Sequence, residues 1–186
     1  MFIIKNNYYL YIENTENIDL NYLNKNKKIS IIYRNNGHQE NIEKLCKFRK
    51  ECFAKNIKLY IANNTKLLKD CKAYGLYISS FNKKKYLNTN LNLIGSAHSF
   101  KEINEKIKQG CKTIFLSRLF KTSYRDKKGH LGLVKFNLFT RKYKMTILPL
   151  GGIRESNLNK LRLVNGNGLA LLSEIKKKPA ITRRLF

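Results

Sequence analysis

The amino-acid sequence predicts an α/β protein that folds as a (β/α)8 TIM barrel, a compact single domain over residues 1–186. Eight short apolar runs rich in β-forming residues recur along the chain. Most of them are continuously apolar, as expected of parallel strands that are covered on both faces. Helical patterns lie between several of these runs, so strands and helices alternate. An open, doubly wound sheet is the alternative that the same pattern allows.

In chain order, the predicted strands are Tyr8–Ile12, Ile29–Tyr33, Ile57–Ala62, Gly75–Ile78, Leu91–Gly95, Thr113–Ser117, Met145–Leu150 and Gly168–Leu172. The first and fourth units are the weakest. Residues 17–24 give only a stub of helix, and residues 81–90 are polar and short. Before the last strand, Leu158, Leu161 and Val164 mark a helix that we expect to end near the following Asn-Gly pair.

Two longer segments have clearer helical patterns. In residues 41–56, apolar side chains share one face and charged residues fill the other. In residues 99–110, Ser99 and Glu102 form a capping box, and Gly110 is placed to end the helix. The apolar residues that repeat at helical spacing in this second segment are Phe100, Ile103 and Ile107.

The chain is strongly basic, with 38 Lys and Arg against 12 Asp and Glu and a formal net charge of +26. Charge of this size can by itself give affinity for nucleic acid or anionic membranes. Lys, Asn, Ile and Tyr are enriched together from end to end, however, as biased codon usage would produce. Nucleic-acid-binding proteins instead concentrate charge in one stripe or tail with interleaved aromatic residues. We therefore expect no specific nucleic-acid partner, and a basic C-terminal tail over residues 176–186.

The cysteines and the N-terminus indicate a cytoplasmic protein. Cys46, Cys52, Cys71 and Cys111 lack metal-ligand or CxxC spacing, so we expect reduced thiols packed as small apolar groups. Residues 1–12 are too short to span a bilayer and lack the features of a signal peptide. We expect a soluble protein without a membrane partner.

The last two strands predict a phosphate-binding site. Gly151 and Gly152 follow the seventh strand and leave backbone N–H groups open to a phosphate oxygen. Leu172, Ser173 and Glu174 follow the eighth strand and could offer further amides. In a (β/α)8 barrel, phosphate commonly binds between these two loops. The alternative is an ordinary tight turn.

The other strand ends are also polar. Their side chains would surround the opening of the barrel at the carboxyl ends of the strands, which we call the mouth. Their candidate ligand-binding residues are Arg34, Asn35 and Asn36 after the second strand, Asn63 and Asn64 after the third, Ser96 and His98 after the fifth, and Thr122, Ser123, Arg125 and Lys127 in the loop after the sixth. His98 is a candidate acid/base, and a structural histidine is the alternative. The two asparagines could simply cap the next helix, and the basic loop could be solvated. Few carboxylates stand at the strand ends, Glu174 among them, so no protein metal site is evident.

Four segments together resemble the thiamine phosphate synthase/TenI family in order and spacing. They are SIIYRNN, IKLYIANNTKLLKDCKAYGLYIS, LIGSAHSFKEINEKIKQGCKTIFLSRLFKT and TILPLGGIRESNLNKLRLVNGNGLALLSEI, over about residues 29–175. The resemblance implies a (β/α)8 barrel. It also implies a synthase that joins hydroxymethylpyrimidine diphosphate to thiazole phosphate and releases diphosphate. In that dissociative reaction, Mg²⁺ and basic residues stabilise the leaving diphosphate.

The resemblance also implies residue roles. The arginine of the family's Q-L-R-x-K strand matches Arg34, while its glutamine and lysine positions hold Ile32 and Asn36. Asn63 matches the first residue of the family's N-D pair, whereas the two metal-binding aspartates fall at Asn64 and near Asn82. The remaining matches are Ser96 and His98 with the S-T-H-S segment, Thr122 with a threonine-rich loop, Arg125 or Lys127 with the lysine of that loop, and Gly151, Gly152 and Ser173 with the thiazole-phosphate cup.

Three functions remain open at this stage. The favoured one is a synthase whose Mg²⁺ is bound through the substrate diphosphate, with the pyrimidine diphosphate and the thiazole phosphate as small-molecule partners. The second is a TenI-like thiazole tautomerase that uses His98 and no metal. The third is a non-catalytic barrel that binds a phosphorylated ligand or contacts nucleic acid through its charge. The sequence leaves open whether the barrel forms a homodimer.

Overall fold

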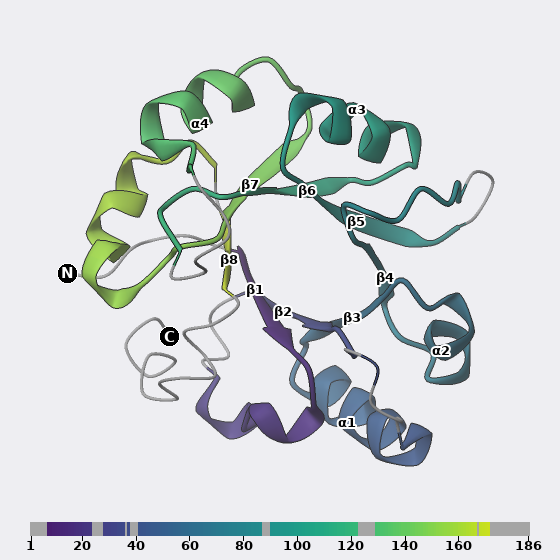
Figure 1. Ribbon diagram of the computed structural model, residues 1–186. Helices are drawn as coiled ribbons and strands as arrows, with labels where there is room; N and C mark the ends of the chain where they lie inside the picture. Colours follow the sequence, from purple (N-terminus) through teal and green to yellow (C-terminus); the bar gives the residue numbers. More distant parts are fainter. Residues whose placement is uncertain are drawn as a thin grey trace.

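The computed structural model contains eight parallel strands that form a closed barrel in sequence order, from β1 to β8 (Figure 1). It describes residues 7–23, 28–35, 37, 41–86, 90–122, 129–166 and 168–171. The strands are β1 Asn7–Ile12, β2 Lys28–Tyr33, β3 Lys58–Ala62, β4 Gly75–Ile78, β5 Asn92–Ala97, β6 Thr113–Ser117, β7 Thr146–Leu150 and β8 Gly168–Leu171. The predicted (β/α)8 barrel is therefore confirmed, and the predicted strand ends lie within two residues of those observed.

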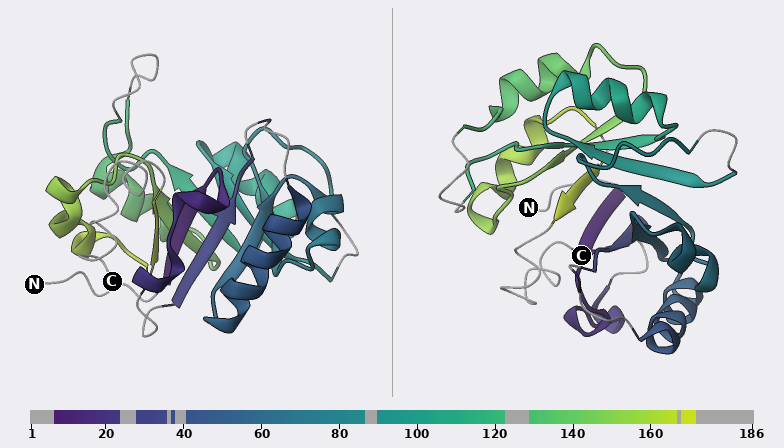
Figure 2. Two further views of the ribbon diagram at one scale, coloured as in Figure 1. Left: turned by 90° about the horizontal axis from the view of Figure 1, so that it is seen from below. Right: turned by 45° about the vertical axis from the view of Figure 1, so that its right-hand side comes forward.

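Helices lie around the outside of the barrel (Figure 2). The α-helices are α1 Ile42–Ala54, α2 Thr65–Asp70, α3 Phe100–Lys108 and α4 Gly132–Thr140. Three 3₁₀ segments complete the set: η1 Thr15–Asn17, η2 Leu20–Tyr22 and η3 Glu155–Leu163. The stub expected after β1 is thus two short 3₁₀ turns, and the segment expected as a helix before β8 is 3₁₀ throughout. In the described part of the chain, no helix is long and apolar enough to cross a bilayer.

Two units depart from the regular pattern. Residues 79–86 and 90–91, which lie between β4 and β5, contain no helix. Helix α4 was not recognised in the sequence, because it is apolar on both faces: Phe136 is buried, whereas Val134 and Leu138 are 73% and 53% exposed. A helix without a charged outer face lacks the amphipathic pattern by which helices are detected.

Side chains that point inward from the strands fill the inside of the barrel. They form a buried cluster of Tyr11, Ile32, Tyr60, Tyr77, Ile94, Phe115, Leu148 and Ala170, against which Tyr9 also packs. The ring centroids of Tyr9 and Phe115 are 4.8 Å apart, and those of Tyr11 and Tyr77 are 5.4 Å apart, both with edge-to-face geometry. The interior is therefore a packed core rather than a channel.

The cysteines pack as expected. Cys52, Cys71 and Cys111 are buried, and Cys46 is partly exposed. Burial raises the pKa of the Cys52 and Cys111 thiols to about 12, so both stay protonated at neutral pH.

The turn after α2 places a lysine where glycine is preferred. Lys72 has a φ of 49°, in the left-handed region, directly after the C-cap residue Cys71. The Ala73 N–H closes the turn by donating to Leu68 O at 3.0 Å. A side chain at this position is strained, and glycine relieves that strain.

We expect Lys72→Gly to raise the free energy of unfolding by about 0.5–1 kcal/mol, since the relief of backbone strain exceeds the added freedom of the unfolded chain. Urea unfolding monitored by circular dichroism measures this change. Lys69→Gly, three residues earlier inside α2, is the matched control. It should lower stability by about 1 kcal/mol. A loss of stability in Lys72→Gly would contradict the assignment.

Candidate active site at the mouth of the barrel

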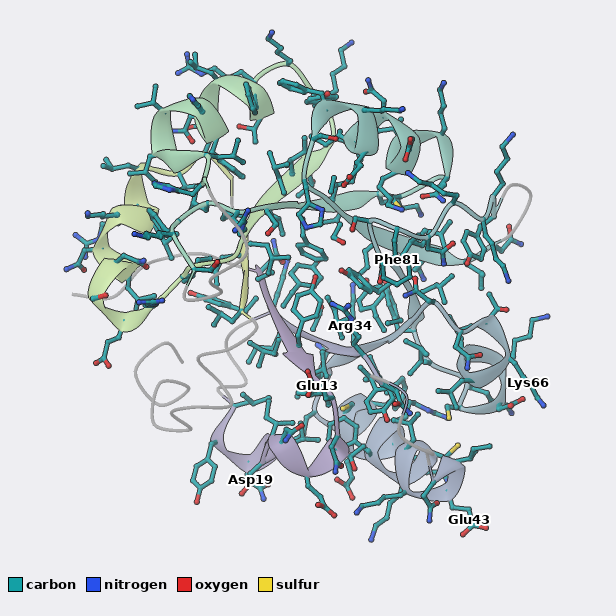
Figure 3. All side chains as sticks on the ribbon, in the orientation of Figure 1. Glu13, Asp19, Arg34, Glu43, Lys66 and Phe81 are labelled. Atoms are coloured by element: carbon teal, nitrogen blue, oxygen red, sulfur yellow. The ribbon has the colours of Figure 1, made fainter. Side chains whose placement is uncertain are left out.

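The carboxyl ends of the parallel strands open on one face of the barrel, and Arg34 lies near the centre of that face (Figure 3). Arg34 directly follows β2, and its backbone N–H donates to Ile12 O at the end of β1, at 2.8 Å. This bond extends the pairing of the two strands by one residue. Arg34 is therefore fixed at the rim, where its guanidinium can meet an anion.

A buried hydroxyl lies close to Arg34. Tyr11 is 2% exposed, and its hydroxyl makes no hydrogen bond of acceptable geometry with a described residue. Burial raises the pKa of Tyr11 well above its usual value and nearby Tyr77 raises it further, while Arg34 lowers it. The hydroxyl thus remains protonated. A buried hydroxyl without a partner is costly, and a bound ligand would supply the missing partner.

Ser96 lies below the mouth, inside the barrel. It is buried, and its Oγ accepts a hydrogen bond from the Tyr77 hydroxyl at 2.8 Å. The structure thus places this predicted substrate-binding residue in the floor of the site.

Asn63, Ser79 and Asn82 form a carboxamide cluster at the ends of β3 and β4. Asn63 Nδ2 donates to Ser79 Oγ at 2.7 Å, and its Oδ1 accepts from the Ser79 N–H at 2.9 Å. Asn82 Nδ2 donates to the same Oδ1 at 3.0 Å. The φ of Asn63 is 57°, a left-handed conformation that asparagine tolerates better than most residues. The cluster therefore depends on asparagine at position 63 for both its backbone and its side chain.

Asn64 does not join this cluster. Its Oδ1 caps α2 by accepting from the Leu67 N–H at 2.9 Å. It also lines a pocket of about 520 Å³ at the carboxyl ends of β2 and β3, together with Asn35 and Lys66. The capping role considered for this residue from the sequence is therefore observed.

These groups do not fit a magnesium ion, because no anionic oxygen is among them. Mg²⁺ prefers anionic or free neutral oxygens in octahedral geometry. Here each carboxamide oxygen already accepts a backbone N–H: Asn63 Oδ1 from Ser79, Asn64 Oδ1 from Leu67, and Asn82 Oδ1 from Lys84 at 2.9 Å. Among the described residues, no group of three or more His, Cys, Asp or Glu side chains could hold a metal ion.

The sequence pattern did not predict the burial of Lys106 on α3. The helical pattern predicts that Ile107 faces the core, but Ile107 is 41% exposed and Lys106 is 0% exposed. Lys106 Nζ donates to Asn82 O at 2.8 Å and to Gln109 Oε1 at 2.9 Å. Gln109 Nε2 donates to Asn82 O at 2.9 Å and to Lys84 O at 2.8 Å. Burial lowers the pKa of Lys106.

The irregular backbone of residues 79–86 explains this burial. Irregular backbone that lies against the barrel needs partners for its carbonyl groups, and Lys106 and Gln109 supply them. Gly95 makes room for the lysine, because a Cβ there would lie 3.0 Å from Lys106 Cδ. Polar side chains of α3 thus hold the segment that carries Asn82.

His98 is paired with a carboxylate at the start of α3. Its Nδ1 lies 3.2 Å from Glu102 Oε2, and the same oxygen accepts the His98 backbone N–H at 2.8 Å. Ser99 caps the helix by accepting from the Glu102 N–H at 3.3 Å, whereas Glu102 turns back to His98 rather than to Ser99. A carboxylate at Nδ1 orients the imidazole and leaves Nε2 for proton transfer.

The turn after β7 has two left-handed glycines. Gly151 and Gly152 have φ values of 90° and 71°. A Cβ at Gly152 would lie 2.3 Å from Phe120 O, so glycine is required here by the close passage of the chain after β6. The Gly152 carbonyl accepts from Asn157 Nδ2 at 2.8 Å. Among the described residues, nothing accepts a hydrogen bond from the Gly152 N–H, which leaves this donor for an anion.

The β6 loop adds a further hydroxyl near this turn. Thr122 Oγ1 is buried, and the described residues offer it no hydrogen-bond partner. Other predicted site residues lie outside the described residues, namely Asn36, Ser123, Arg125, Lys127, Leu172, Ser173 and Glu174.

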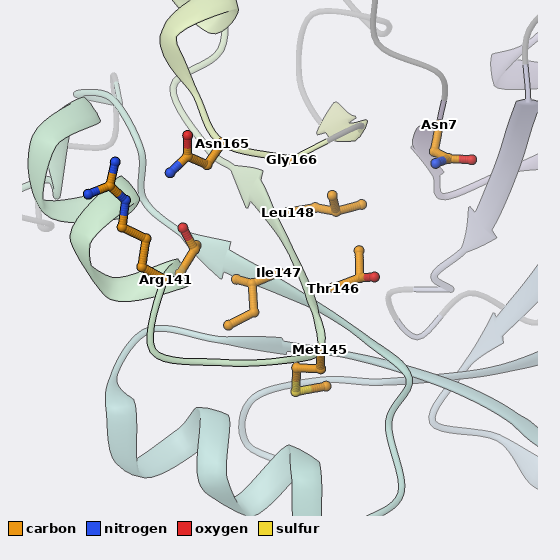
Figure 4. A pocket seen from close by; sticks show the side chains of 9 residues that line it. Asn7, Arg141, Met145, Thr146, Ile147, Leu148, Asn165 and Gly166 are labelled. Carbon is orange, nitrogen blue, oxygen red and sulfur yellow. The ribbon is translucent and has the colours of Figure 1, made fainter.

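A pocket of about 550 Å³ lies at the opposite end of the barrel (Figure 4). Its lining includes Asn7 and Thr146, the first residues of β1 and β7, together with Arg141. These are amino-terminal strand ends, so this pocket is separate from the mouth.

Comparison with known proteins gives consistent relatives. The family described as thiamine monophosphate synthase matches residues 19–175. A thiamine-phosphate synthase from Dictyoglomus turgidum is 23% identical over 158 residues, which cover 80% of this chain and 70% of that protein. Another from Prochlorococcus marinus is 30% identical over 80 residues, 43% of this chain and 23% of that protein. The chain therefore spans less than a quarter of this second relative.

Among solved structures, a thiamine phosphate pyrophosphorylase from Pyrococcus furiosus is similar, with a TM-score of 0.77 and 16% identity, covering 98% of this chain and 93% of that one. Identity at this level supports the fold alone. The family match extends from η2 to β8 and includes Arg34, Asn63, His98 and Gly152. The chain therefore belongs to the thiamine monophosphate synthase/TenI family.

Proposed function

We propose that this protein is a thiamine phosphate synthase, which couples hydroxymethylpyrimidine diphosphate to thiazole phosphate and releases diphosphate. One observation carries the proposal: the mouth has two separate features suited to anions. Arg34 follows β2, and the open Gly152 N–H follows β7, which lies three strands away around the barrel. A reaction that joins two phosphorylated substrates needs two such places, whereas an isomerase needs one.

The diphosphate belongs at the Arg34 side in this proposal. The reaction breaks the bond between the pyrimidine methylene carbon and the diphosphate oxygen, so negative charge grows on the leaving group. A guanidinium stabilises that charge with paired N–H donors. The Tyr11 hydroxyl is buried beside Arg34 and can donate to an oxygen of the substrate.

The thiazole phosphate belongs at the turn after β7. The Gly152 N–H and the Thr122 hydroxyl are donors without described partners, and both suit phosphate oxygens. Binding there would hold the thiazole nitrogen toward the pyrimidine methylene carbon. The nitrogen lone pair then forms the new C–N bond as the diphosphate departs, and holding the two reactants together lowers the entropic cost of the step.

A thiazole tautomerase is the second candidate, and the His98–Glu102 pair is the observation that favours it. The imidazole is half-exposed at the end of β5, and the carboxylate orients it for proton transfer. Such an isomerisation needs one phosphate site and an acid/base.

The synthase proposal predicts that the purified protein forms thiamine phosphate from the two substrates. Arg34→Gln should lower kcat/KM by about 10²–10³-fold, since the leaving group loses a charge-assisted donor. Lys28→Gln removes a cation from the other end of the same strand and should change the rate less than twofold. If the wild-type protein binds thiazole phosphate but forms no product with Mg²⁺ or with EDTA, the synthase proposal fails.

The tautomerase candidate predicts that His98→Gln abolishes thiazole isomerisation, because the proton-transferring group is lost. Glu102→Gln should lower kcat about tenfold or more by releasing the ring from its orientation. His130→Gln, at another described histidine, serves as the control. Isomerisation that proceeds at the wild-type rate in His98→Gln would remove this histidine from the reaction. Phosphate binding without either activity would leave a non-catalytic barrel.

A further inference from the structure

The carboxamide cluster at the ends of β3 and β4 carries no charge of its own. The oxygens of Asn63 and Asn82 accept backbone N–H groups, as described above, and the Asn63 oxygen also accepts from Asn82 Nδ2. A divalent cation would gain only neutral oxygens here, which bind it more weakly than carboxylates do. The Asn82 amide group already donates to Asn63 Oδ1 at 3.0 Å and to the Tyr86 hydroxyl at 3.2 Å, so the cluster brings neutral dipoles rather than charge to this end.

Lys106 places a positive charge directly behind this cluster. Its ammonium is 0% exposed and is held by the carbonyl of Asn82 and by Gln109 Oε1, both of which are neutral. The two carboxylates on its own helix are engaged elsewhere, since Glu102 pairs with His98 and Glu105 with Lys83. A buried ammonium without a paired carboxylate exerts its field over a longer range than a solvated one.

We propose that the diphosphate end of the mouth binds its anion without a protein-bound magnesium ion. In this arrangement, the Lys106 ammonium, held by Gln109 behind Asn82, supplies part of the positive charge that a metal ion would supply. Lys106 acts through Asn82 rather than by touching the ligand, so it is a positioning residue. The inference rests on the proposed synthase function, because that function requires a diphosphate at this end.

The charged groups at this end of the mouth determine which ion it attracts. Arg34 and the buried ammonium contribute two positive charges to this end, Glu13 directly after β1 contributes one negative charge, and the carboxamides of the cluster are neutral (Figure 3). Mg²⁺ placed among these groups would be repelled by the ammonium. A diphosphate placed there would be attracted by it. Salt screens this attraction less than an attraction between two exposed charges, because the ammonium is buried.

Titration calorimetry with inorganic pyrophosphate tests this inference without requiring turnover. Binding to the wild-type protein in EDTA should be as tight as binding in Mg²⁺, within about threefold, because the fixed charges are sufficient. Binding that is more than tenfold tighter with Mg²⁺ would overturn the inference.

Lys106→Met should weaken pyrophosphate binding in EDTA by about tenfold, because the unscreened charge is lost. The matched control is Lys108→Met, which removes an exposed lysine from the same helix and should change the affinity less than twofold. Circular dichroism establishes whether Lys106→Met is folded. Equal affinities for the two folded variants would contradict a role for the buried charge.

Asn82→Asp keeps the test decisive if Lys106→Met does not fold. The new carboxylate should weaken metal-free pyrophosphate binding by about tenfold, and added Mg²⁺ should restore it, because a carboxylate both repels the anion and binds the metal. A merely structural role of this position would not produce such a change in metal dependence. Unchanged binding of Asn82→Asp in EDTA would overturn the inference.

The two proposals fail in different ways. If pyrophosphate binds only with Mg²⁺, the inference about Lys106 is wrong and the synthase proposal stands. If pyrophosphate does not bind in either buffer while inorganic phosphate still binds, the mouth holds one anion. Both proposals are then wrong.

Discussion

Aromatic side chains occupy the space that the eight strands enclose, and their packing against one another determines what the mouth can do. Tyr11 packs edge to face against both Tyr77 and Phe115 in the upper part of the barrel, so the axis of the barrel is filled by side chains. Chemistry is thereby confined to the rim formed by the strand ends. The same rings supply the polar groups of the floor, where Tyr77 bonds to Ser96 and the Tyr11 hydroxyl lies near Arg34.

The rim above this floor has two chemically different sides. The turn after β7 is held by backbone contacts with the chain after β6, and glycine at position 152 is needed for that approach. The tight turn thus leaves the Gly152 N–H group open, and this group is a suitable donor to a phosphate. On the other side, the left-handed backbone of Asn63 brings its carboxamide to Ser79 and Asn82. Both sides are therefore held in place by contacts within the protein.

Much of the fold could be predicted from the sequence, because parallel strands covered on both faces are continuously apolar. The groups at the strand ends followed from topology, and Arg34, Asn63 and Gly152 lie at the strand ends that the prediction gave them. Helix α4 could not be recognised, since Val134 and Leu138 make its outer face apolar. The burial of Lys106 could not be predicted from the sequence either. It depends on the irregular backbone of residues 79–86, whose carbonyl groups need donors.

The buried lysine and the neutral residue at position 82 are best understood as one electrostatic unit. An aspartate at position 82 would lie on the segment that Lys106 holds, and the two opposite charges would largely cancel. With asparagine there, the ammonium keeps its field, and the carboxamide oxygen is free to stabilise the backbone at Lys84. Removing the lysine alone would leave Gln109 Oε1 without its donor, at a cost of about 1–3 kcal/mol, whereas Asn82 O would keep the bond from Gln109 Nε2. Restoring the carboxylate alone would neutralise the charge on which anion binding at this end depends. The two positions therefore constrain each other, and a change at one alters the metal requirement of the mouth through the other.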